Sequence, residues 1–358
     1  MNGNYSTWSG MPVKVGTVAG AKYGLPAVVT PDRIGDVASL ASWLNTQSKW
    51  QANMLSKHGG LLFRGFGVRT PKDFEMLARA IDPELKNKYL GTSPRDALTD
   101  YVFSASELPG YYPIPQHCEM TFTANPPRRI FFWCGTQPKS PGGETPLVDF
   151  AQVWKDLAPS VRERFEKGGI RIVRNYSGPG STSKDFFQLK RWDQMFRTAD
   201  KAQVEEMARA EGFEPQWHEN DRLTLISRHS PMRLHPETGE PVWFNHAQVF
   251  HLSTAPAEFL RIFRFRPSLR SLGLWLFSSA LVSWKRLRLS PDEQAMHTTY
   301  ADGSEIPRAD MNQVRDAIWN NLVVYAWKQG DVVALDNNRI GHGRLPYSGP
   351  RMVAVCWA

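Results

Sequence analysis

The chain has 358 residues, 41% of them hydrophobic and 22% charged, so it can bury a large core and its composition argues against intrinsic disorder. The net charge of +8 comes from Lys and Arg residues scattered along the chain rather than gathered in a stripe, so we expect no nucleic-acid partner. Three cysteines lie far apart and form neither a disulfide framework nor a C-x-x-C metal site, which predicts a reducing, cytoplasmic compartment.

The first predicted elements are two helices with a strand between them. Thr30, followed by a proline, is typical of a helix N-cap and predicts a helix over 31–55. Thr70, also followed by a proline, predicts a second helix over 71–81. The segment GGLLFRGFGV at 59–68 predicts a buried strand. It is not a dinucleotide-binding loop, because its G-x-G lacks a third glycine and no helix follows directly.

Strands and helices then follow without a repeat. Further strands are predicted at 129–134, 169–176, 222–230 and 241–246, and further helices at 149–167, 199–211 and 308–326. The C-terminal segment 331–358 reads as two strand-like runs around a Gly-rich bend. Because there is no β-α-β alternation, we expect a mainly β fold, a sandwich or barrel core with helical insertions, in a single domain over 1–358.

Two segments stand apart from this core. Residues 268–289, SLRSLGLWLFSSALVSWKRLRL, contain an uncharged stretch at 271–284 that is too short for a transmembrane helix, which needs about 20 residues. The segment reads as a helix packed within the protein, a lid over a pocket, or a surface for a partner or membrane interface, and we favour the packed helix. Residues 184–196, KDFFQLKRWDQMF, read equally as a mobile lid or an ordinary amphipathic helix.

The segment PQHCEMTF at 115–122 holds a candidate metal site. In an extended chain His117 and Glu119 point to the same face and can hold one metal. A lone H-x-E triplet is common by chance and more often makes an ion pair, here for example between Glu119 and Arg128. A third ligand is therefore needed. His342 is the most attractive of the nine histidines, because it follows a strand and lies between glycines, where the backbone can approach a site closely.

Two imidazoles and one carboxylate form the facial triad of non-haem Fe(II) oxygenases, which leaves positions open for a cosubstrate and O2. Arg351 follows His342 by nine residues, at the start of the last predicted strand. A guanidinium there suits a dicarboxylate chelator, whose far carboxylate it can bind through two parallel hydrogen bonds. Alternatively, His342 could be a hydrogen-bonded core histidine and Arg351 a surface ion pair.

The order of His117-x-Glu119, GGET and DNNRIGHGRLPYSGPR resembles the taurine dioxygenase-like, or clavaminate synthase-like, family of Fe(II)/2-oxoglutarate oxygenases. The blocks FSASELPGYYPIPQHCEM, PKSPGGETPLVD, VWFN and QGDVVALDNNRIGHGR resemble the branch that includes the syringomycin biosynthesis hydroxylase-like proteins. The resemblance begins near residue 59. It implies a double-stranded β-helix, or jelly-roll, core. It also implies Fe(II) on His117, Glu119 and His342, and 2-oxoglutarate on Arg351 and the hydroxyl of Thr145, although Thr145 could instead simply begin a strand.

The resemblance also indicates the reaction. Family halogenases have Gly or Ala at the carboxylate position, so Glu119 favours hydroxylation, with desaturation or ring closure as further outcomes. Many relatives have Asp there, and Met352 replaces a second arginine that the family often shows. The expected substrate is a small amino-acid-like or carboxylate molecule of a biosynthetic pathway, free or bound to a carrier protein, with O2 as cosubstrate and succinate and CO2 as products. Asn245 and Arg344 are candidate substrate contacts, although Arg344 could instead brace the iron loop.

Two other kinds of protein fit parts of this pattern. A zinc-dependent hydrolase or a cupin-type isomerase could use the same two histidines and one glutamate, but it would not need Arg351 at the far end of a dicarboxylate. A non-catalytic binding protein could keep the fold, but it would not need a metal site with open positions. Metal analysis of the purified protein distinguishes these alternatives.

Overall fold

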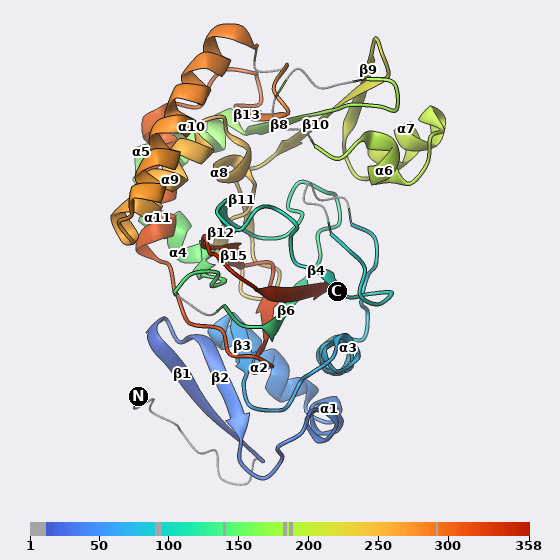
Figure 1. Ribbon diagram of the computed structural model, residues 1–358, viewed down its shortest axis with the longest axis vertical. Helices are drawn as coiled ribbons and strands as arrows, with labels where there is room; N and C mark the ends of the chain where they lie inside the picture. The colour runs from blue at the N-terminus through green and yellow to red at the C-terminus, as the bar shows by residue number, and fades with distance from the viewer. Residues whose placement is uncertain (1–11, 90–94, 139–140, 182–184, 186–188, 291–292) are drawn as a thin grey trace.

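The computed structural model of the protein describes residues 12–89, 95–138, 141–181, 185, 189–290 and 293–358. A seven-stranded sheet runs through them in the order β1-β2-β3-β14-β6-β16-β4 (Figure 1). Neighbouring strands are antiparallel, except that β2 and β3 are parallel. The strands are β1 (Val13–Lys22), β2 (Leu25–Pro31), β3 (Gly60–Phe63), β4 (Phe103–Ser104), β6 (Arg129–Thr136), β14 (Val332–Asp336) and β16 (Met352–Trp357). This sheet confirms the predicted core of strands with helices inserted between them.

The central strands are buried on both faces, and their side chains alternate between two hydrophobic cores. In β6, Phe131 and Trp133 belong to one core, whereas Ile130, Phe132 and Cys134 belong to the other. The same period of two divides β14 and β16. Three N-terminal helices cover the first core: α1 (Val37–Asn45), α2 (Ser48–His58) and α3 (Pro71–Ile81).

Three smaller sheets complete the strands. The four-stranded sheet has the order β13 (Met296–Thr299), β8 (Ile170–Tyr176), β10 (Arg222–His229) and β9 (Glu214–His218). The two-stranded sheet pairs β11 (Met232–Leu234) with β12 (Pro241–Trp243). The three-stranded sheet has the order β5 (Ile114–His117), β15 (Ile340–Arg344) and β7 (Leu147–Asp149). It faces the second core, because the rings of Phe132 in β6 and His342 in β15 lie 4.7 Å apart.

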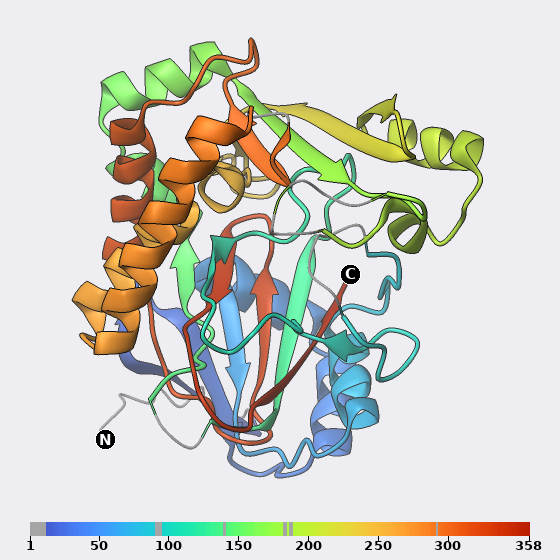
Figure 2. The same ribbon diagram turned by 45° about the horizontal axis from the view of Figure 1, so that its top comes forward.

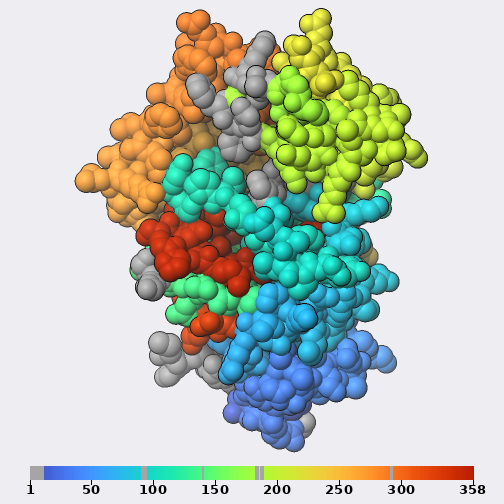
Figure 3. Space-filling model, turned by 45° about the vertical axis from the view of Figure 1, so that its right-hand side comes forward, coloured from blue at the N-terminus to red at the C-terminus, as the bar shows by residue number. Residues whose placement is uncertain are grey.

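The other helices lie around these sheets (Figure 2). They are α4 (Phe150–Asp156), α5 (Pro159–Gly168), α6 (Trp192–Phe196), α7 (Lys201–Ala210), α8 (Ala247–Phe250), α9 (Thr254–Phe265), α10 (Leu269–Arg288) and α11 (Arg308–Asn320). Figure 3 shows the N-terminal helices, in blue, and the yellow-green segment of α6, α7 and β9 at opposite ends of one face. None of the helices that the structure describes is long and apolar enough to cross a membrane.

The N-terminal helix prediction was wrong in its start and its length. Thr30 lies in β2 and pairs with β1, and Asp36 caps the first helix by accepting a hydrogen bond from the Ser39 backbone. The predicted helix over 31–55 is two helices, α1 and α2, because the chain turns at Thr46. The second prediction is confirmed: Thr70 and Asp73 form a reciprocal capping box at the start of α3.

Other boundaries also differ from the predictions: the helix predicted over 308–326 ends at Asn320, and the strand predicted over 241–246 ends at Trp243. The predicted helix over 149–167 is divided into α4 and α5, because Leu157 and Ala158 are extended and Pro159 starts a new helix. The C-terminal segment contains three strands rather than two, because the residues read as a Gly-rich bend form β15. The segment 184–196 contains α6 in its second half, while 184 and 186–188 lie outside the described residues.

Helix α10 agrees with the predicted segment 268–289, but not with a helix buried in the protein. Its buried residues are Ser271, Ser278 and Lys285, which repeat every seven residues along one face. Some of its large apolar side chains are exposed instead, with Leu269 89% exposed and Leu287 83% exposed, whereas others such as Trp275 and Leu281 are partly buried. The preferred interpretation as a packed helix therefore holds for the side of α10 that contacts α9 and is wrong for its exposed apolar residues.

Candidate metal centre and cosubstrate pocket

Two adjacent strands bring the candidate histidines together. His117 is the last residue of β5, and it pairs directly with His342 in the antiparallel register of β5 and β15. Their ring centroids lie 4.6 Å apart. His117 Nδ1 lies 2.8 Å from the carbonyl oxygen of Pro115, so it donates there and leaves Nε2 with a free lone pair. Cross-strand pairing thus gathers two imidazoles that are far apart in the sequence.

Glu119 lies just beyond the end of β5, and Asn337 fixes its backbone. The Glu119 N–H donates to Asn337 Oδ1 at 2.7 Å, and Asn337 Nδ2 donates to the Glu119 carbonyl at 3.1 Å. The same amide also donates to the Pro127 carbonyl at 2.7 Å. Asn337 directly follows β14, so the turn after a strand of the seven-stranded sheet holds the glutamate in place beside the three-stranded sheet.

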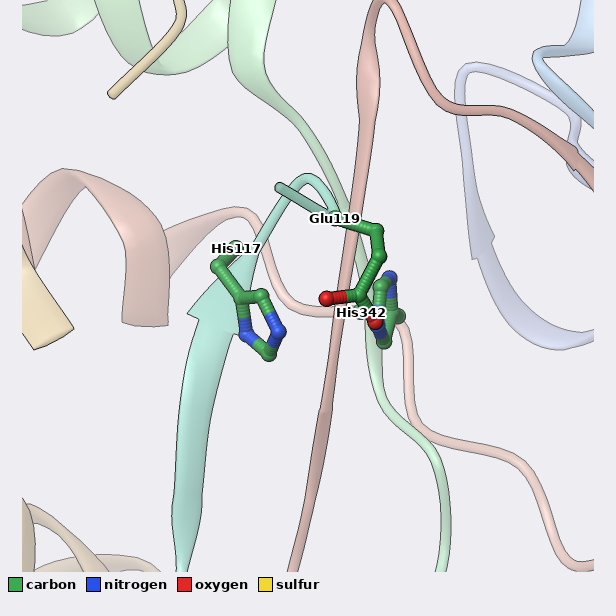
Figure 4. A group of neighbouring side chains, drawn as sticks. All are labelled: His117, Glu119 and His342. Atoms are coloured by element: carbon green, nitrogen blue, oxygen red, sulfur yellow. The ribbon is translucent and has the colours of Figure 1, made fainter. Parts of the chain in front are cut away.

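The three candidate ligands converge, as Figure 4 shows. One ligand atom from each of His117, Glu119 and His342 lies within 4.8 Å of the others, and all three side chains are buried or nearly so. Burial lowers the pKa of His117 and holds that of His342 well below its usual range, so both imidazoles are neutral and can bind a metal. Two neutral imidazoles and one carboxylate fit Fe(II), and one face of such a site stays open.

Glycines allow the backbone to approach the centre closely. A Cβ atom on Gly343 would lie 2.4 Å from the Ile114 carbonyl oxygen, and one on Gly341 would lie 2.0 Å from the Phe150 ring. Both distances are too short for any side chain. His342 therefore lies between two positions where the pairing of β15 with its neighbours requires glycine, as its sequence context predicted.

Arg95 is the charged partner of Glu119, which sequence reasoning missed. Its Nη2 donates to Glu119 Oε2 at 2.7 Å and to the Tyr89 hydroxyl at 3.1 Å, while its guanidinium lies 4.2 Å from the centre of the Tyr89 ring. Burial alone would lower the pKa of Arg95, but Tyr89 and Glu119 raise it overall. The alternative partner considered from the sequence, Arg128, pairs with Asp82 instead. A buried cation thus neutralises the carboxylate of the site.

Asn337→Ala is expected to weaken metal binding roughly 10- to 100-fold, as is typical when a group that orients a ligand is removed. The free energy of unfolding should also fall, by about 2 kcal/mol, because buried backbone groups lose partners. Anaerobic titration with Co(II) measures the affinity. Asn338→Ala is the matched control, because its amide contacts Arg233 rather than Glu119. Unchanged Co(II) affinity in Asn337→Ala would show that Asn337 only stabilises the fold.

Arg95→Ala is expected to destabilise the metal-free protein by about 3 kcal/mol, because Glu119 becomes a buried carboxylate without a partner. A divalent cation then takes over the neutralising role, so Mn(II) should raise the melting temperature of the variant more than that of the wild type. Thermal unfolding with and without Mn(II) tests this. Arg95→Lys keeps the charge, so its rise in melting temperature with Mn(II) should lie between those of Arg95→Ala and the wild type. Equal Mn(II) stabilisation in all three proteins would contradict the expectation.

The cosubstrate candidates lie in the same pocket as the three ligands, a cavity of about 220 Å³. Arg351 Nε donates to the Gly143 carbonyl at 2.7 Å, and its two terminal nitrogens have no hydrogen-bond partner among the described residues. Burial, with a contribution from Arg344, lowers the pKa of Arg351 to about 10, so it stays charged at neutral pH. Thr145 Oγ1 accepts from Trp327 Nε1 at 3.1 Å and can still donate.

The two candidate substrate contacts differ in their placement. Arg344 lines the pocket, but its terminal nitrogens donate to the carbonyls of Leu108, Pro109 and Tyr112 at 2.8–3.0 Å. It braces the loop before β5. Asn245 is not among the residues that line the pocket, and both ends of its amide are bound to backbone groups. The amide of Asn245 is therefore committed to the backbone, whereas Arg344 still has an unpaired Nε among the described residues.

His246 and Lys190 also line the pocket, and the sequence did not single them out. The ring of His246 lies 5.1 Å from that of His117, and its Nδ1 lies 2.6 Å from Thr121 Oγ1. The pKa of His246 lies well below its usual range, first because of burial. His246 directly follows the VWFN block, and Lys190 lies in the segment 184–196 that was read as a possible lid, so these were the available signals.

The chain matches the family described as Taurine catabolism dioxygenase TauD, TfdA family, over residues 23–357. It is 28% identical over 302 residues to the dapdiamide synthesis protein DdaC of Enterobacter agglomerans, covering 84% of this chain and 82% of DdaC. It is 26% identical over 338 residues to a clavaminate synthase-like protein of Arabidopsis thaliana, covering 92% of each chain.

Solved structures resemble the fold at low sequence identity. PvcB from Pseudomonas aeruginosa matches with a TM-score of 0.53 and 13% identity, over 98% of this chain and 93% of PvcB. AAD-2 in complex with Mn(II) and N-oxalylglycine matches with a TM-score of 0.50 and 12% identity, over 97% of each chain. At such identities the likeness concerns the fold alone.

Proposed function

The chain belongs to the TauD/TfdA family and is an Fe(II)/2-oxoglutarate-dependent dioxygenase, and from this premise we propose which residues carry the reaction. His117, Glu119 and His342 hold the iron, and Arg351 with Thr145 holds 2-oxoglutarate. The observation that carries this assignment is the convergence of two neutral imidazoles and one carboxylate in a pocket that also contains an arginine with free terminal nitrogens. When bound, iron with 2-oxoglutarate and O2 supplies the oxidant that attacks a substrate C–H bond.

The residues around this centre position the reactants and exclude water. Arg351 binds the far carboxylate of 2-oxoglutarate through its two terminal nitrogens, and its guanidinium lies 5.3 Å from the centre of the Tyr347 ring. The Thr145 hydroxyl donates a hydrogen bond to the same carboxylate. Its Oγ1 already accepts from Trp327 Nε1, so its proton is available for this bond. Phe122, Phe132, Phe250 and other apolar residues line the pocket and keep it dry.

We propose that the substrate is a small amino-acid-like or carboxylate molecule, free or attached to a carrier protein. Four cationic side chains line the pocket, and Glu119 is the one carboxylate among the described lining residues. The cations are Arg95, Lys190, Arg344 and Arg351. This excess of positive charge favours an anionic substrate beside the cosubstrate. The names of DdaC, a dapdiamide synthesis protein, and of PvcB, an oxygenase from an isonitrile synthetic pathway, support a biosynthetic role.

The occupied carboxylate position favours hydroxylation, desaturation or ring closure over halogenation. We propose further that the seven-stranded and three-stranded sheets together form a double-stranded β-helix. Two facing sheets with the ligands between them support this arrangement. The family match over residues 23–357 supports a single catalytic domain.

The decisive experiment is anaerobic absorption spectroscopy of the wild type with Fe(II) and 2-oxoglutarate. A weak visible charge-transfer band that requires both additions is the expected result. Succinate release is then measured with a panel of amino acids and other carboxylates, and the active compound is examined for hydroxylated, desaturated or cyclised products. No band, together with zinc in the purified protein, would refute the assignment and favour a zinc hydrolase.

A further inference from the structure

Helix α10 has an unusual distribution of side chains. The α10 stripe, defined as Leu269, Leu276, Phe277, Trp284 and Leu287, is exposed by 42% to 89%. At about 100° per residue these five positions fall within about 100° of the helix circumference, so they form one continuous stripe. The opposite face packs through Ser271, Ser278 and Lys285, and Lys285 pairs with Asp185 at 2.5 Å. These five large apolar residues therefore face outward, while small and polar residues occupy the most buried positions of the helix.

The stripe lies at an edge of the molecule. Figures 1 and 2 show α9 and α10, in orange, side by side along the outside of the fold. Exposed apolar surface of this extent on a helix marks an interaction site, because soluble monomers rarely leave such patches uncovered. None of the five residues lines the metal-centre pocket.

A second, separate cavity adjoins the same helix. It lies between α9, α10 and α11, has a volume of about 260 Å³, and is lined by Arg261, Arg264, Arg286 and Arg308 with a single carboxylate, Asp316. We call it the arginine groove. Arg261 pairs with Asp316 at 2.6 Å, whereas the other three arginines are exposed and have no ion pair among the described residues.

The groove carries a net positive charge, because four arginines and one carboxylate line it. The pKa of Arg315, buried beside it, is lowered to about 10, first by burial and also by the positive charges of Arg261 and Arg308. From residue 259 to residue 291 the sequence contains no acidic residue. It contains seven basic ones, of which Arg261, Arg266 and Lys285 pair with carboxylates elsewhere in the chain. The other four have no ion pair among the described residues: Arg264, Arg270, Arg286 and Arg288. A ligand for this face must therefore supply negative charge.

The charges also argue against a second copy of this chain as the partner. In an antiparallel pair of α10 helices, Arg270 of one copy would lie near Arg286 and Arg288 of the other. A parallel pair would place identical arginines together. Since α10 has no acidic residue, neither arrangement offers compensation. A bilayer with anionic headgroups meets both requirements, because it accepts an apolar stripe and provides phosphates at the same depth.

We propose that the face formed by α9, α10 and α11 binds the surface of an anionic phospholipid bilayer. The α10 stripe enters the boundary between headgroups and acyl chains, and Arg264, Arg286 and Arg308 bind lipid phosphates in the arginine groove. The enzyme then works at a membrane surface without spanning it. This inference does not depend on the identity of the substrate.

The test is co-sedimentation of the full-length protein with two kinds of vesicle, phosphatidylcholine alone and phosphatidylcholine mixed with phosphatidylglycerol. The wild type is expected to bind only the anionic vesicles, and less so as NaCl is raised, because salt screens the attraction. The variant R264S/R286S/R308S should bind about a hundredfold more weakly, at roughly fivefold per lost charge. The variant L276S/F277S should bind the anionic vesicles at least about tenfold more weakly than the wild type.

Matched controls separate these effects from general charge and hydrophobicity. K49S/R69S/K72S removes three exposed positive charges far from α10 along the chain, and M76S/L234S removes two exposed apolar side chains elsewhere. Both controls should bind like the wild type. All variants should keep the Fe(II)/2-oxoglutarate absorption band, which shows that the fold is intact.

Three outcomes would overturn the proposal. Equal loss of binding in the groove variant and its charge control would show unspecific attraction. Binding of soluble glycerol phosphate without vesicle binding would assign the groove to a free phosphate compound. Absence of vesicle binding, with lipid-free dimers that L276S/F277S abolishes, would assign the stripe to a second copy of the chain.

Discussion

Glu119→Gln is expected to abolish metal binding and turnover while leaving the fold intact. The amide has the size of the carboxylate, and the hydrogen bonds between Asn337 and the backbone of residue 119 stay in place. The amide oxygen can still accept from Arg95, although the ion pair with this buried cation is lost. The change removes the one anionic ligand of the candidate site. We expect metal affinity to fall by more than the roughly 10- to 100-fold that is typical when a group that only orients a ligand is removed.

Co(II) titration and succinate release measure this loss. Glu144→Gln is the matched control, because Glu144 is a nearby buried carboxylate that pairs with Arg266 at 2.8 Å and is not among the candidate ligands. It should bind Co(II) like the wild type. If Glu119→Gln retained wild-type Co(II) affinity and succinate release, the assignment of Glu119 as a ligand would be wrong.

Arg351→Ala is expected to weaken binding of 2-oxoglutarate while leaving metal binding unchanged. The variant loses two charge-assisted hydrogen bonds to the far carboxylate, which together contribute about 3 kcal/mol or more. That corresponds to a rise of roughly a hundredfold in the 2-oxoglutarate dissociation constant. Arg351→Lys keeps the charge but not the planar pair of donors, so its dissociation constant should lie between those of Arg351→Ala and the wild type.

Titration of the anaerobic absorption band with 2-oxoglutarate measures this constant in each variant, and Co(II) affinity of the cosubstrate-free protein is the internal control. If the variant lost less turnover at saturating 2-oxoglutarate than at low 2-oxoglutarate, Arg351 would act mainly in binding the cosubstrate. A band in Arg351→Ala with the wild-type dissociation constant would place the dicarboxylate on another residue.

The sequence predicted those parts of the molecule whose determinants are local or periodic. Thr70 and Asp73 form the capping box within four residues of each other, and the alternating side chains of β6 follow from its own sequence. The sequence could indicate His117 and His342 as joint candidates because each has a local pattern. His117 belongs to an H-x-E triplet, and His342 follows a strand and lies between glycines. The structure brings them to the same place, although their role as iron ligands is still a prediction.

Residues whose roles depend on contacts distant in sequence were missed. Arg95 and Glu119 are 24 residues apart, and nothing in the segment around Arg95 indicates that its side chain reaches the carboxylate. Thr30 was wrongly placed at a helix start because β2 exists only through its pairing with β1 and β3, which overrides a local capping signal. The orientation of α10 was missed for the same reason. Which of its sides faces solvent is decided by the elements that pack against it, and these lie elsewhere in the sequence.

The pairing of β5 with β15 also determines when the proposed metal site can form during synthesis. His117 and His342 are 225 residues apart in the chain, and β14, which lies between β3 and β6, is likewise made late in translation. A ribosome-bound chain that has exposed only His117 and Glu119 has no third ligand. The proposed site is therefore completed only after the C-terminal strands have been made and have paired with the earlier ones.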